Sequence, residues 1–487
     1  MKNKGRSIAF LTLGRGFNAL VNLLFLPYMA RALVPADYAT YGQILLLVEM
    51  AVIFLSVTNN QYLYVLLSNS REHNKKDVLL TSFVANVALS LFGVVALLFS
   101  LDFICELFHN DSLKEPLRIY AYSVFPILLI SNLNYVLYFF DRVKHAMSIQ
   151  IVLNLFRVSA IVIGIQYFES LSIVFTFLLI INFAILFMFI PRFPVKFFSG
   201  KFRKIILRSF VKFGYVLALT GVIGTLIKKT DGLMVSSLLE DPSQYAIFRI
   251  GGIEIPFLMI FYSSVITVLL PDVTRLFAEG KIDELVSLKR KATSASALII
   301  YPTLVFILFF SFPALSFYFG EQYLESIPIF IVFNLVMFFK VNDYRDVLVA
   351  SSKTNTLIRA DILVLVVNVI LNFVLIQFLG AMGAAIATLI SFILLAGLLN
   401  FKTTKFLDIK SFSFYDLKMI ASVLLSSLAL SFAFFWLYRY TDSLLFIPIF
   451  FVLYSAIIYS ILYRVNFEAK AIISNVMGRF LNKRKQV

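Results

Sequence analysis

The chain has 487 residues, of which 60% are hydrophobic and only 14% are charged. Soluble domains are about 45–50% apolar and about 25% charged, so this chain has too little polar surface to cover a water-soluble body. Its apolar residues occur in blocks of about 20, the length that crosses a bilayer, and its net charge of +16 is spread between these blocks. The composition therefore excludes a soluble fold and a nucleic acid partner, and it predicts an all-α polytopic membrane protein.

Sequence motifs for catalysis and for metal binding are missing. Cys105 is the single cysteine, which excludes an intramolecular disulfide and a cysteine-based metal site. The sequence has no Gly-x-x-x-x-Gly-Lys-Ser/Thr phosphate loop, no His-Glu-x-x-His and no Gly-x-Ser-x-Gly. We therefore expect a protein that is not an enzyme, with no catalytic residues, no cofactor and no metal site.

Hydropathy over a window of about 19 residues predicts fourteen membrane-spanning helices. We expect a six-helix bundle in 1–200, a second six-helix bundle in 201–405, and an extra helix pair with a cytoplasmic tail in 406–487. Twelve helices are the alternative if two spans are wrong. In chain order the predicted spans are 8–30, 38–66, 78–108, 117–140, 146–167, 171–190, 209–238, 244–270, 293–319, 326–350, 357–379, 382–401, 416–438 and 444–463.

Basic residues between the spans indicate the orientation in the membrane. With the N-terminus inside, the cytoplasmic segments contain 32 Lys and Arg residues, whereas the outside loops contain only 4. Because basic residues accumulate on the cytoplasmic side, we expect both ends of the chain in the cytoplasm. The outside loops are about ten residues long, which is too short for a folded external domain.

A short motif occurs twice in the chain. Pro35-Ala-Asp-Tyr-Ala-Thr-Tyr41 opens the second predicted span, and Pro242-Ser-Gln-Tyr-Ala-Ile-Phe248 opens the eighth. Six spans separate the two copies, an even number, so the two halves would have the same orientation. Parallel repeats of this kind are a known transporter design. The alternative is a chance similarity between two helix starts.

Charged and amide side chains within the spans are the candidate functional residues, because a charge at the bilayer centre usually faces a cavity or a partner. Arg15, Asn18 and Asn22 lie on one face of the first span, since they are three and four residues apart. Basic side chains in a cavity suit an anionic substrate, because Arg binds a phosphate with two parallel hydrogen bonds and Lys acts as a point charge. The predicted substrate-binding set is Arg15, Asn18, Asn22, Arg157, Lys228, Lys229 and Arg249.

Three carboxylates in the spans, Glu49, Asp231 and Glu254, are candidates for binding a coupling cation or a proton. The alternative role for each of them is to be a salt-bridge partner. For Asp231, the neighbouring partners in the sequence are Lys228 and Lys229.

Structural alternatives exist for the other polar candidates as well. The Arg15 and Arg249 side chains could reach the membrane surface and bind nothing. The asparagines could form hydrogen bonds between helices. In the tenth span, Arg345 could pair with the adjacent Asp346.

Four segments carry a resemblance to a known family. In their order and spacing they resemble the polysaccharide-transport branch of the multidrug/oligosaccharidyl-lipid/polysaccharide (MOP) exporter superfamily, which includes the Wzx-type O-antigen flippases. Two positions depart from that pattern: Ala39 and Gly232 stand where family members often have Gly and a basic residue, respectively. The four segments are Pro27-Tyr-Met-Ala-Arg-Ala-Leu-Val-Pro-Ala-Asp-Tyr-Ala-Thr-Tyr41, Asp231-Gly-Leu-Met234, Leu269-Leu-Pro-Asp-Val-Thr-Arg-Leu-Phe-Ala-Glu-Gly280 and Gly380-Ala-Met-Gly-Ala-Ala-Ile-Ala-Thr388.

The resemblance implies a MATE-like fold, with two six-helix bundles around a central cavity and two further C-terminal helices. It implies a flippase that moves an undecaprenyl-diphosphate-linked oligosaccharide from the cytoplasmic to the outer leaflet of the bacterial inner membrane by alternating access. The oligosaccharide would be an O-antigen or related repeat unit of lipopolysaccharide or surface polysaccharide biosynthesis. The expected partners are this substrate, membrane lipids, a polysaccharide polymerase and a chain-length regulator.

Three other functions remain alternatives at the level of sequence. A cation or drug antiporter would share the fold but would need carboxylates and aromatic residues in its cavity instead of basic residues. A flippase for a lipid-linked peptidoglycan precursor would have a similarly basic cavity. A membrane oligosaccharide polymerase or ligase is disfavoured, because the outside loops are short.

The orientation can be tested with single cysteines. After replacement of Cys105, we expect an impermeant thiol reagent added to intact spheroplasts to label Ser443→Cys and not Ser199→Cys, because Ser199 lies in a predicted cytoplasmic loop. Labelling after lysis is the control for reactivity at both positions. Labelling of Ser199→Cys in intact spheroplasts would contradict the predicted topology.

Overall fold

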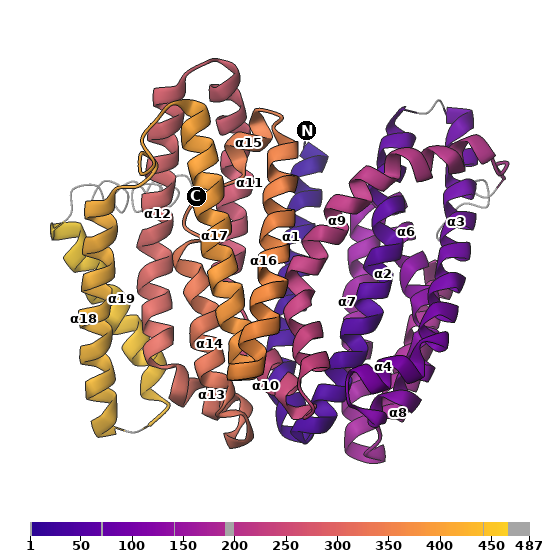
Figure 1. The fold of residues 1–487 in the computed structure, drawn as a ribbon, viewed down its shortest axis with the longest axis horizontal. Helices are drawn as coiled ribbons and strands as arrows, with labels where there is room; N and C mark the ends of the chain where they lie inside the picture. Colours follow the sequence, from indigo (N-terminus) through magenta and orange to yellow (C-terminus); the bar gives the residue numbers. More distant parts are fainter. Residues whose placement is uncertain (1, 70–71, 141, 190–198, 442, 466–487) are drawn as a thin grey trace. The chain divides into compact units, whose positions relative to one another are not determined.

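The computed structural model describes residues 2–69, 72–140, 142–189, 199–441 and 443–465, and every regular element in these residues is helical (Figure 1). The side chain of Arg15 lies outside the described part. Eleven of the described helices are long and apolar enough to cross a membrane. The predicted all-α polytopic membrane fold is therefore confirmed.

The chain divides into two compact units. Unit 1 consists of Met1–Arg249 with Ile376–Ala381, and unit 2 consists of Ile250–Leu375 with Met382–Val487. The boundaries of these units follow the contacts within the folded chain, and they do not test the bundle limits that the sequence predicts. Those limits, 1–200, 201–405 and 406–487, remain a prediction.

Unit 1 contains the first ten helices, except that the last two residues of α10 belong to unit 2. All predicted spans from the first to the seventh lie on these helices. A 3-10 turn, η1 (Asp111–Leu113), precedes α5. The helices are α1 (Lys2–Ala32), α2 (Pro35–Asn69), α3 (Glu72–Phe99), α4 (Leu101–Leu107), α5 (Lys114–Ala121), α6 (Val124–Phe139), α7 (Val143–Phe168), α8 (Leu171–Phe189), α9 (Lys204–Leu238) and α10 (Ser243–Gly251).

Unit 2 holds most of the remaining helices, on which the later part of the eighth predicted span and the ninth to fourteenth spans lie. Its two 3-10 turns are η4 (Glu321–Tyr323) and η5 (Val336–Phe338). The helices are α11 (Pro256–Ala278), α12 (Ile282–Phe309), α13 (Ser311–Phe319), α14 (Ser326–Leu335), α15 (Asp346–Ala350), α16 (Thr354–Leu379), α17 (Ala381–Leu407), α18 (Leu417–Thr441) and α19 (Phe446–Val465).

Five of the predicted spans fall on more than one helix, which corrects the expectation of one continuous helix in each; they are 78–108, 117–140, 244–270, 293–319 and 326–350. The two longest breaks are those in 244–270 and 326–350. The span 244–270 breaks between α10 and α11, because Pro256 disfavours a helical conformation of the residue before it, and Ile255 is extended at φ −66° and ψ 108°. The span 326–350 breaks after η5, where a run of charged residues precedes α15.

The two breaks are joined to each other within unit 2. The Asn334 amide nitrogen donates to the carbonyl oxygen of Ile253 at 3.0 Å, and its amide oxygen accepts from the backbone nitrogen of Ile255 at 3.3 Å. The Lys340 ammonium lies 2.6 Å from the Glu254 carboxylate. Because irregular backbone at membrane depth must find its hydrogen bonds inside the protein, these contacts explain why both breaks are tolerated.

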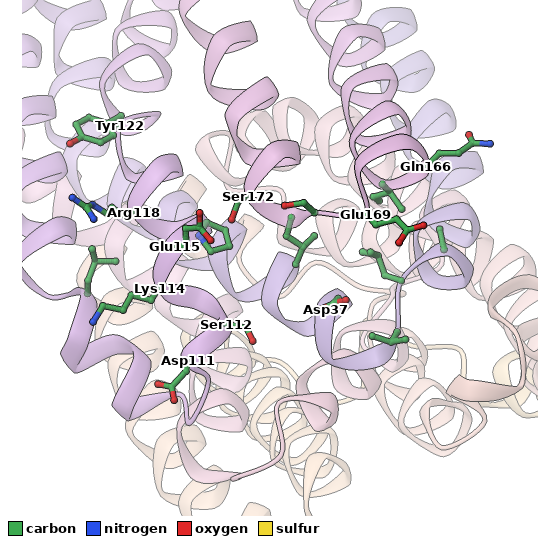
Figure 2. A pocket seen from close by; sticks show the side chains of 18 of the residues that line it. Asp37, Asp111, Ser112, Lys114, Glu115, Arg118, Tyr122, Gln166, Glu169 and Ser172 are labelled. Carbon is green, nitrogen blue, oxygen red and sulfur yellow. The ribbon is translucent and has the colours of Figure 1, made fainter.

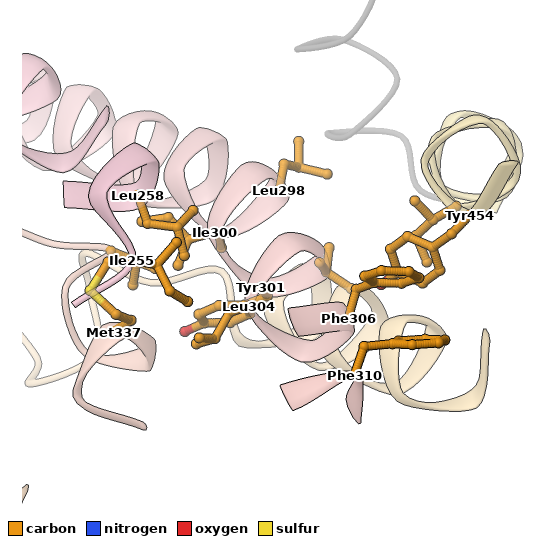
Figure 3. Close-up of a cluster of buried hydrophobic side chains, with 14 of the residues drawn as sticks. Ile255, Leu258, Leu298, Ile300, Tyr301, Leu304, Phe306, Phe310, Met337 and Tyr454 are labelled. Atoms are coloured by element: carbon orange, nitrogen blue, oxygen red, sulfur yellow. The ribbon is translucent and has the colours of Figure 1, made fainter. Parts of the chain in front are cut away.

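The core of unit 2 is formed where α12 packs against α18 and α19. Phe306 lies between Phe310 and Tyr454, with ring centroids 4.4 and 5.0 Å away (Figure 3). Such aromatic pairs contribute about 0.5–1.5 kcal/mol beyond the area that they bury. This cluster fixes the last helix pair to the rest of the unit.

Pro302 interrupts the hydrogen bonds of α12, and tyrosines of α19 compensate for it. A proline has no N–H, so the carbonyl oxygen of Leu298, four residues earlier, lacks its helical partner. The Tyr459 hydroxyl donates to Leu298 O at 3.3 Å, and the Tyr454 hydroxyl donates to Pro302 O at 3.0 Å. The tyrosines therefore satisfy backbone oxygens that lipid could not.

We expect Tyr459→Phe to lower the free energy of unfolding by about 1 kcal/mol, because the Leu298 carbonyl then loses its donor. Thermal unfolding of the purified protein in detergent measures the effect. Tyr440→Phe is the matched control, since Tyr440 on α18 is 71% exposed. Equal melting temperatures for the two variants would show that the Leu298 carbonyl does not need this hydrogen bond.

Candidate functional site

A cavity of about 460 Å³ lies within unit 1, and we call it the arginine cavity. Residues of α1, α2, α5, α6, α7, α8 and α10 line it, so segments far apart in the sequence meet there. Most of its lining is apolar, and a few polar groups converge on it, as in ligand sites generally. The polar and tyrosine side chains in the lining are Asn22, Tyr38, Tyr41, Glu49, Tyr120, Asn154, Arg157 and Arg249.

Arg249 is held between two tyrosines of α2. Its guanidinium carbon lies 5.3 Å from the ring centroid of Tyr38 and 5.5 Å from that of Tyr41, which are cation–π distances. The Nη1 atom of Arg249 is buried and has no hydrogen-bond partner among the described residues. Because a buried donor without a partner costs about 1–3 kcal/mol, an acceptor entering the cavity would be favoured at this position.

The two copies of the repeated motif are responsible for this arrangement. Pro35 starts α2 and places Tyr38 and Tyr41 on one buried face, while the second copy places Tyr245 and Arg249 one helical turn apart on α10. The Tyr245 hydroxyl donates to the carbonyl oxygen of Gly42 at 3.4 Å. The motif copies, far apart in the sequence, therefore lie against each other in unit 1.

Gly42 is required by the close approach of α10 to α2. A Cβ atom at this position would overlap the Arg249 guanidinium and would lie 2.8 Å from the Tyr245 ring. Gly232 on α9 is buried beneath the same tyrosine, since a Cβ atom there would lie 3.3 Å from its ring. The Tyr245 ring therefore leaves little room for the basic side chain that family members often have at the position of Gly232.

Arg157 of α7 is the second arginine of the cavity. Its Nη2 atom donates to the amide oxygen of Asn182 at 2.8 Å, and Asn182 in turn donates to the Ser123 hydroxyl at 3.3 Å. The Nε atom of Arg157 is buried and lacks a hydrogen-bond partner within the described ranges. Arg157 is therefore positioned by one amide and retains a free donor.

A second cavity, of about 380 Å³, continues from the arginine cavity toward the N-terminal end of α1. The two cavities share the lining residues Asn22, Asn154 and Arg157. Asn18 lines the second cavity and accepts a hydrogen bond from the Asn154 amide at 3.3 Å. Asn18, Asn22 and Arg157, predicted separately from the sequence, therefore lie in one continuous polar region.

The remaining predicted residues have varied surroundings. The Lys229 ammonium lies 2.7 Å from the carboxylate of Glu49, which itself lines the arginine cavity. Lys228 is exposed on α9 and does not line the cavity, and Asp231 is buried on the same helix. Glu254 belongs to unit 2, where Lys340 is its partner. Whether any of these residues binds substrate or a coupling ion stays a prediction.

Two salt bridges differ from the pairings that sequence proximity suggested. Arg345 pairs with Asp361, not with the adjacent Asp346, and Asp346 instead pairs with the buried Lys289. Neighbours in a helix point in different directions, so a partner on another helix is often closer than the next residue.

Sequence reasoning did not select Tyr38, Tyr41 and Tyr120 as lining residues, although the first two are part of the repeated motif. Their spacing of three residues places Tyr38 and Tyr41 on one helix face, which was the available signal. Over the described part of the chain, no three His, Cys, Asp or Glu side chains are close enough to hold a metal ion.

The fold is similar to those of solved transporters. The structure described as "Lipid II flippase MurJ, inward closed conformation" has a TM-score of 0.75 at 19% identity, over 94% of this chain and 99% of that one. An inward-facing multidrug resistance MATE family transporter of the MOP superfamily has a TM-score of 0.66 at 14% identity, over 82% and 98%. A MOP superfamily transporter from Pyrococcus furiosus has a TM-score of 0.53 at 14% identity, over 83% and 95%.

Two family models match the sequence. The model described as polysaccharide biosynthesis protein matches residues 28–328, and the model described as lipid II flippase MurJ matches residues 253–457. No curated protein matches it. The fold and these matches define the chain as a member of the MOP exporter superfamily. Within that superfamily it belongs to the polysaccharide biosynthesis protein family, whose model covers more than half of its length.

We expect Gly42→Ala to lower the free energy of unfolding by about 1–3 kcal/mol, because the added methyl group must displace Arg249 or Tyr245. Thermal unfolding in detergent measures this loss. Gly224→Ala on α9 is the control, since no atom lies within 4 Å of a Cβ atom built there. An unchanged melting temperature for Gly42→Ala would contradict the close packing of α10 on α2.

Proposed function

We propose that the chain is a flippase that moves an undecaprenyl-diphosphate-linked oligosaccharide from the cytoplasmic to the outer leaflet of the bacterial inner membrane. The observation that carries this proposal is the arginine cavity, where Arg157 and Arg249 each keep a buried N–H without a partner in the described residues. A diphosphate offers several charged oxygens to such donors, and each charge-assisted hydrogen bond contributes about 1.5–3 kcal/mol.

Membership in a polysaccharide biosynthesis family supports a sugar-bearing substrate. In this proposal the diphosphate and sugar occupy the polar cavities, while the polyprenyl chain stays in the lipid. The arginine cavity, of about 460 Å³, is comparable in volume to an ordinary small-ligand pocket. An O-antigen or related surface polysaccharide unit is the proposed cargo, with a polymerase and a chain-length regulator as partners.

Alternating access by movement of two six-helix bundles is the proposed mechanism. Both chain ends would lie in the cytoplasm, consistent with the distribution of basic residues. Glu49 is the first candidate for ion coupling, because it joins the cavity lining to Lys229 of α9 through a salt bridge that is partly exposed. Asp231 and Glu254 are the other candidates, and Arg15 would extend the basic lining toward the cytoplasmic end.

A flippase for a lipid-linked peptidoglycan precursor is the second candidate function. It is favoured by the MurJ family model over residues 253–457 and by the similar fold of a lipid II flippase. Both substrates carry a diphosphate, so the arginine cavity suits either one. A drug antiporter has less support, because the cavity presents two arginines against one carboxylate that already has a partner.

Variants of the two arginines test the proposal in a strain that lacks the chromosomal gene. We expect Arg249→Ala and Arg157→Ala each to slow export of surface polysaccharide by roughly ten- to a hundredfold at normal protein levels, because the variant loses a charge-assisted bond. Arg249→Lys should retain part of the activity, because the charge remains without the bidentate geometry. Arg15→Ala should behave like the other alanine variants.

The measurements are the amount of surface polysaccharide and of lipid-linked units that face the cytoplasm. Arg275→Ala is the control, since this arginine on α11 is exposed and outside the cavity. Full export by the Arg249→Ala and Arg157→Ala variants at wild-type abundance would refute the anion-binding role. Lysis with accumulated peptidoglycan precursor in the deletion strain, instead of lost surface polysaccharide, would favour the second candidate.

A further inference from the structure

A larger pocket of unit 1 is separate from the arginine cavity and is not used in the proposed function. It has a volume of about 1420 Å³, and we call it the outer vestibule (Figure 2). Its walls come from the α1–α2 junction, from the segment between α3 and α6, and from the α7–α8 junction. In the proposed orientation these segments face the outside of the cell.

The outer vestibule lies beyond the arginine cavity along the same two helices. On α1, the arginine cavity is lined by residues from Asn22 to Met29, and the vestibule begins at Tyr28. On α7, the arginine cavity ends at Ile161, and the vestibule begins at Ile165, one helical turn further. Phe25, which lines the arginine cavity, stacks on Tyr28, which lines the vestibule, with ring centroids 5.7 Å apart.

The chemistry of the outer vestibule differs from that of the arginine cavity. Five carboxylates line it, together with two basic side chains, Lys114 and Arg118, so it carries an excess of negative charge. This field opposes a diphosphate. Figure 2 shows three of the carboxylates around the centre of the pocket and the two basic residues along one side. The five are Asp37, Asp102, Asp111, Glu115 and Glu169.

Hydroxyl, amide and aromatic groups complete the lining. Ser112, Ser172 and Gln166 add neutral hydrogen-bonding groups, and Tyr122, which is 46% exposed, presents an aromatic ring. Carboxylates and amides accept hydrogen bonds from hydroxyl groups, and aromatic faces cover the apolar side of a ring. A pocket larger than the usual 300–1,000 Å³ has room for several linked sugar rings.

The wall that carries Asp111 and Glu115 is fixed in place. The buried Asn110 amide donates to the Thr40 hydroxyl at 2.9 Å and to the Gln43 side-chain oxygen at 2.8 Å, which ties this segment to α2. The Lys114 ammonium lies 2.7 Å from the Asp102 carboxylate. A wall that is ordered before binding costs less entropy when a ligand arrives.

Glu169 occupies a backbone position that favours glycine. It ends α7 in the left-handed conformation, with φ at 49°. In this conformation a side chain has a steric cost that a glycine would not have, and the chain nevertheless carries a carboxylate here. This position also provides a variant that removes a carboxylate from the vestibule without harming the fold.

We propose that the outer vestibule binds the oligosaccharide part of the substrate after it has passed the arginine cavity, and that it is selective for neutral or amino sugars. The inference rests on the proposed flippase function and orientation. Carboxylates there accept hydrogen bonds from sugar hydroxyls, while their charge keeps the diphosphate out. The two sites would then divide the substrate, with the diphosphate held by arginines and the sugar by the vestibule.

Site-specific photocrosslinking in cells that make the glycolipid tests this division. The probe is p-benzoylphenylalanine, placed either at Tyr122 in the outer vestibule or at Leu45 in the arginine cavity. After irradiation, mass spectrometry of the purified full-length protein identifies the adducts by their sugar content. We expect sugar-bearing adducts at both positions.

A vestibule variant with Asp37→Asn, Glu115→Gln and Glu169→Gly should lower the sugar adduct at Tyr122 by about fivefold, since each lost hydrogen bond changes binding two- to tenfold. The adduct at Leu45 should persist. A control variant with Glu106→Gln, Glu240→Gln and Glu321→Gln removes three exposed acids that do not line the vestibule and should change neither adduct. Thermal unfolding checks that both variants fold.

The outcomes separate the two proposals. Sugar adducts at Leu45 alone would overturn the vestibule inference and leave the proposed flippase intact. No sugar adduct at either position would overturn both. A protein or plain phospholipid adduct at Tyr122, without sugar, would assign the vestibule to a different ligand. An unchanged Tyr122 adduct in the folded vestibule variant would show that the vestibule carboxylates do not bind the sugar.

Discussion

The structure depends on one constraint, which is that lipid offers no hydrogen bonds to the groups that it surrounds. The irregular places at Pro302 and before Pro256 each have a donor or acceptor from another helix. Tyr459 serves the carbonyl oxygen left free by Pro302, and Asn334 serves both sides of the break before Pro256. Where two polar atoms of arginines remain without partners in the described residues, both arginines line the same cavity.

The same constraint connects the fold to the site. Broken helices are costly in a membrane, so a chain keeps them where the irregular backbone or its side chains have a use. In unit 2 the Glu254–Lys340 pair and Asn334 join the two breaks, which makes them one structural element instead of two separate defects. In unit 1 the polar groups that line the arginine cavity are supplied by side chains.

The sequence was sufficient for the all-α membrane fold and for the positions of most spans, because hydropathy reports the solvent around each helix and lipid allows little else. It was also sufficient to place Asn22, Arg157 and Arg249 together as candidates, since an intramembrane charge needs a cavity or a partner. It was insufficient for salt-bridge partners. Lys229 with Glu49 and Arg345 with Asp361 are tertiary pairs, which no periodicity within one helix can indicate. The helix breaks were missed because a hydropathy window averages over a whole span and does not register where the backbone leaves the helix.

The tyrosine contacts of Arg249 have a mechanical consequence. Arg249 is the last residue of unit 1 along this part of the chain, and Ile250 is the first residue of unit 2. An anion that draws the guanidinium away from Tyr38 and Tyr41 therefore applies its force one peptide bond from the place where the backbone passes from one unit to the next. Under the proposed function, the residue that would contact the diphosphate and the first residue of unit 2 are therefore neighbours in the chain.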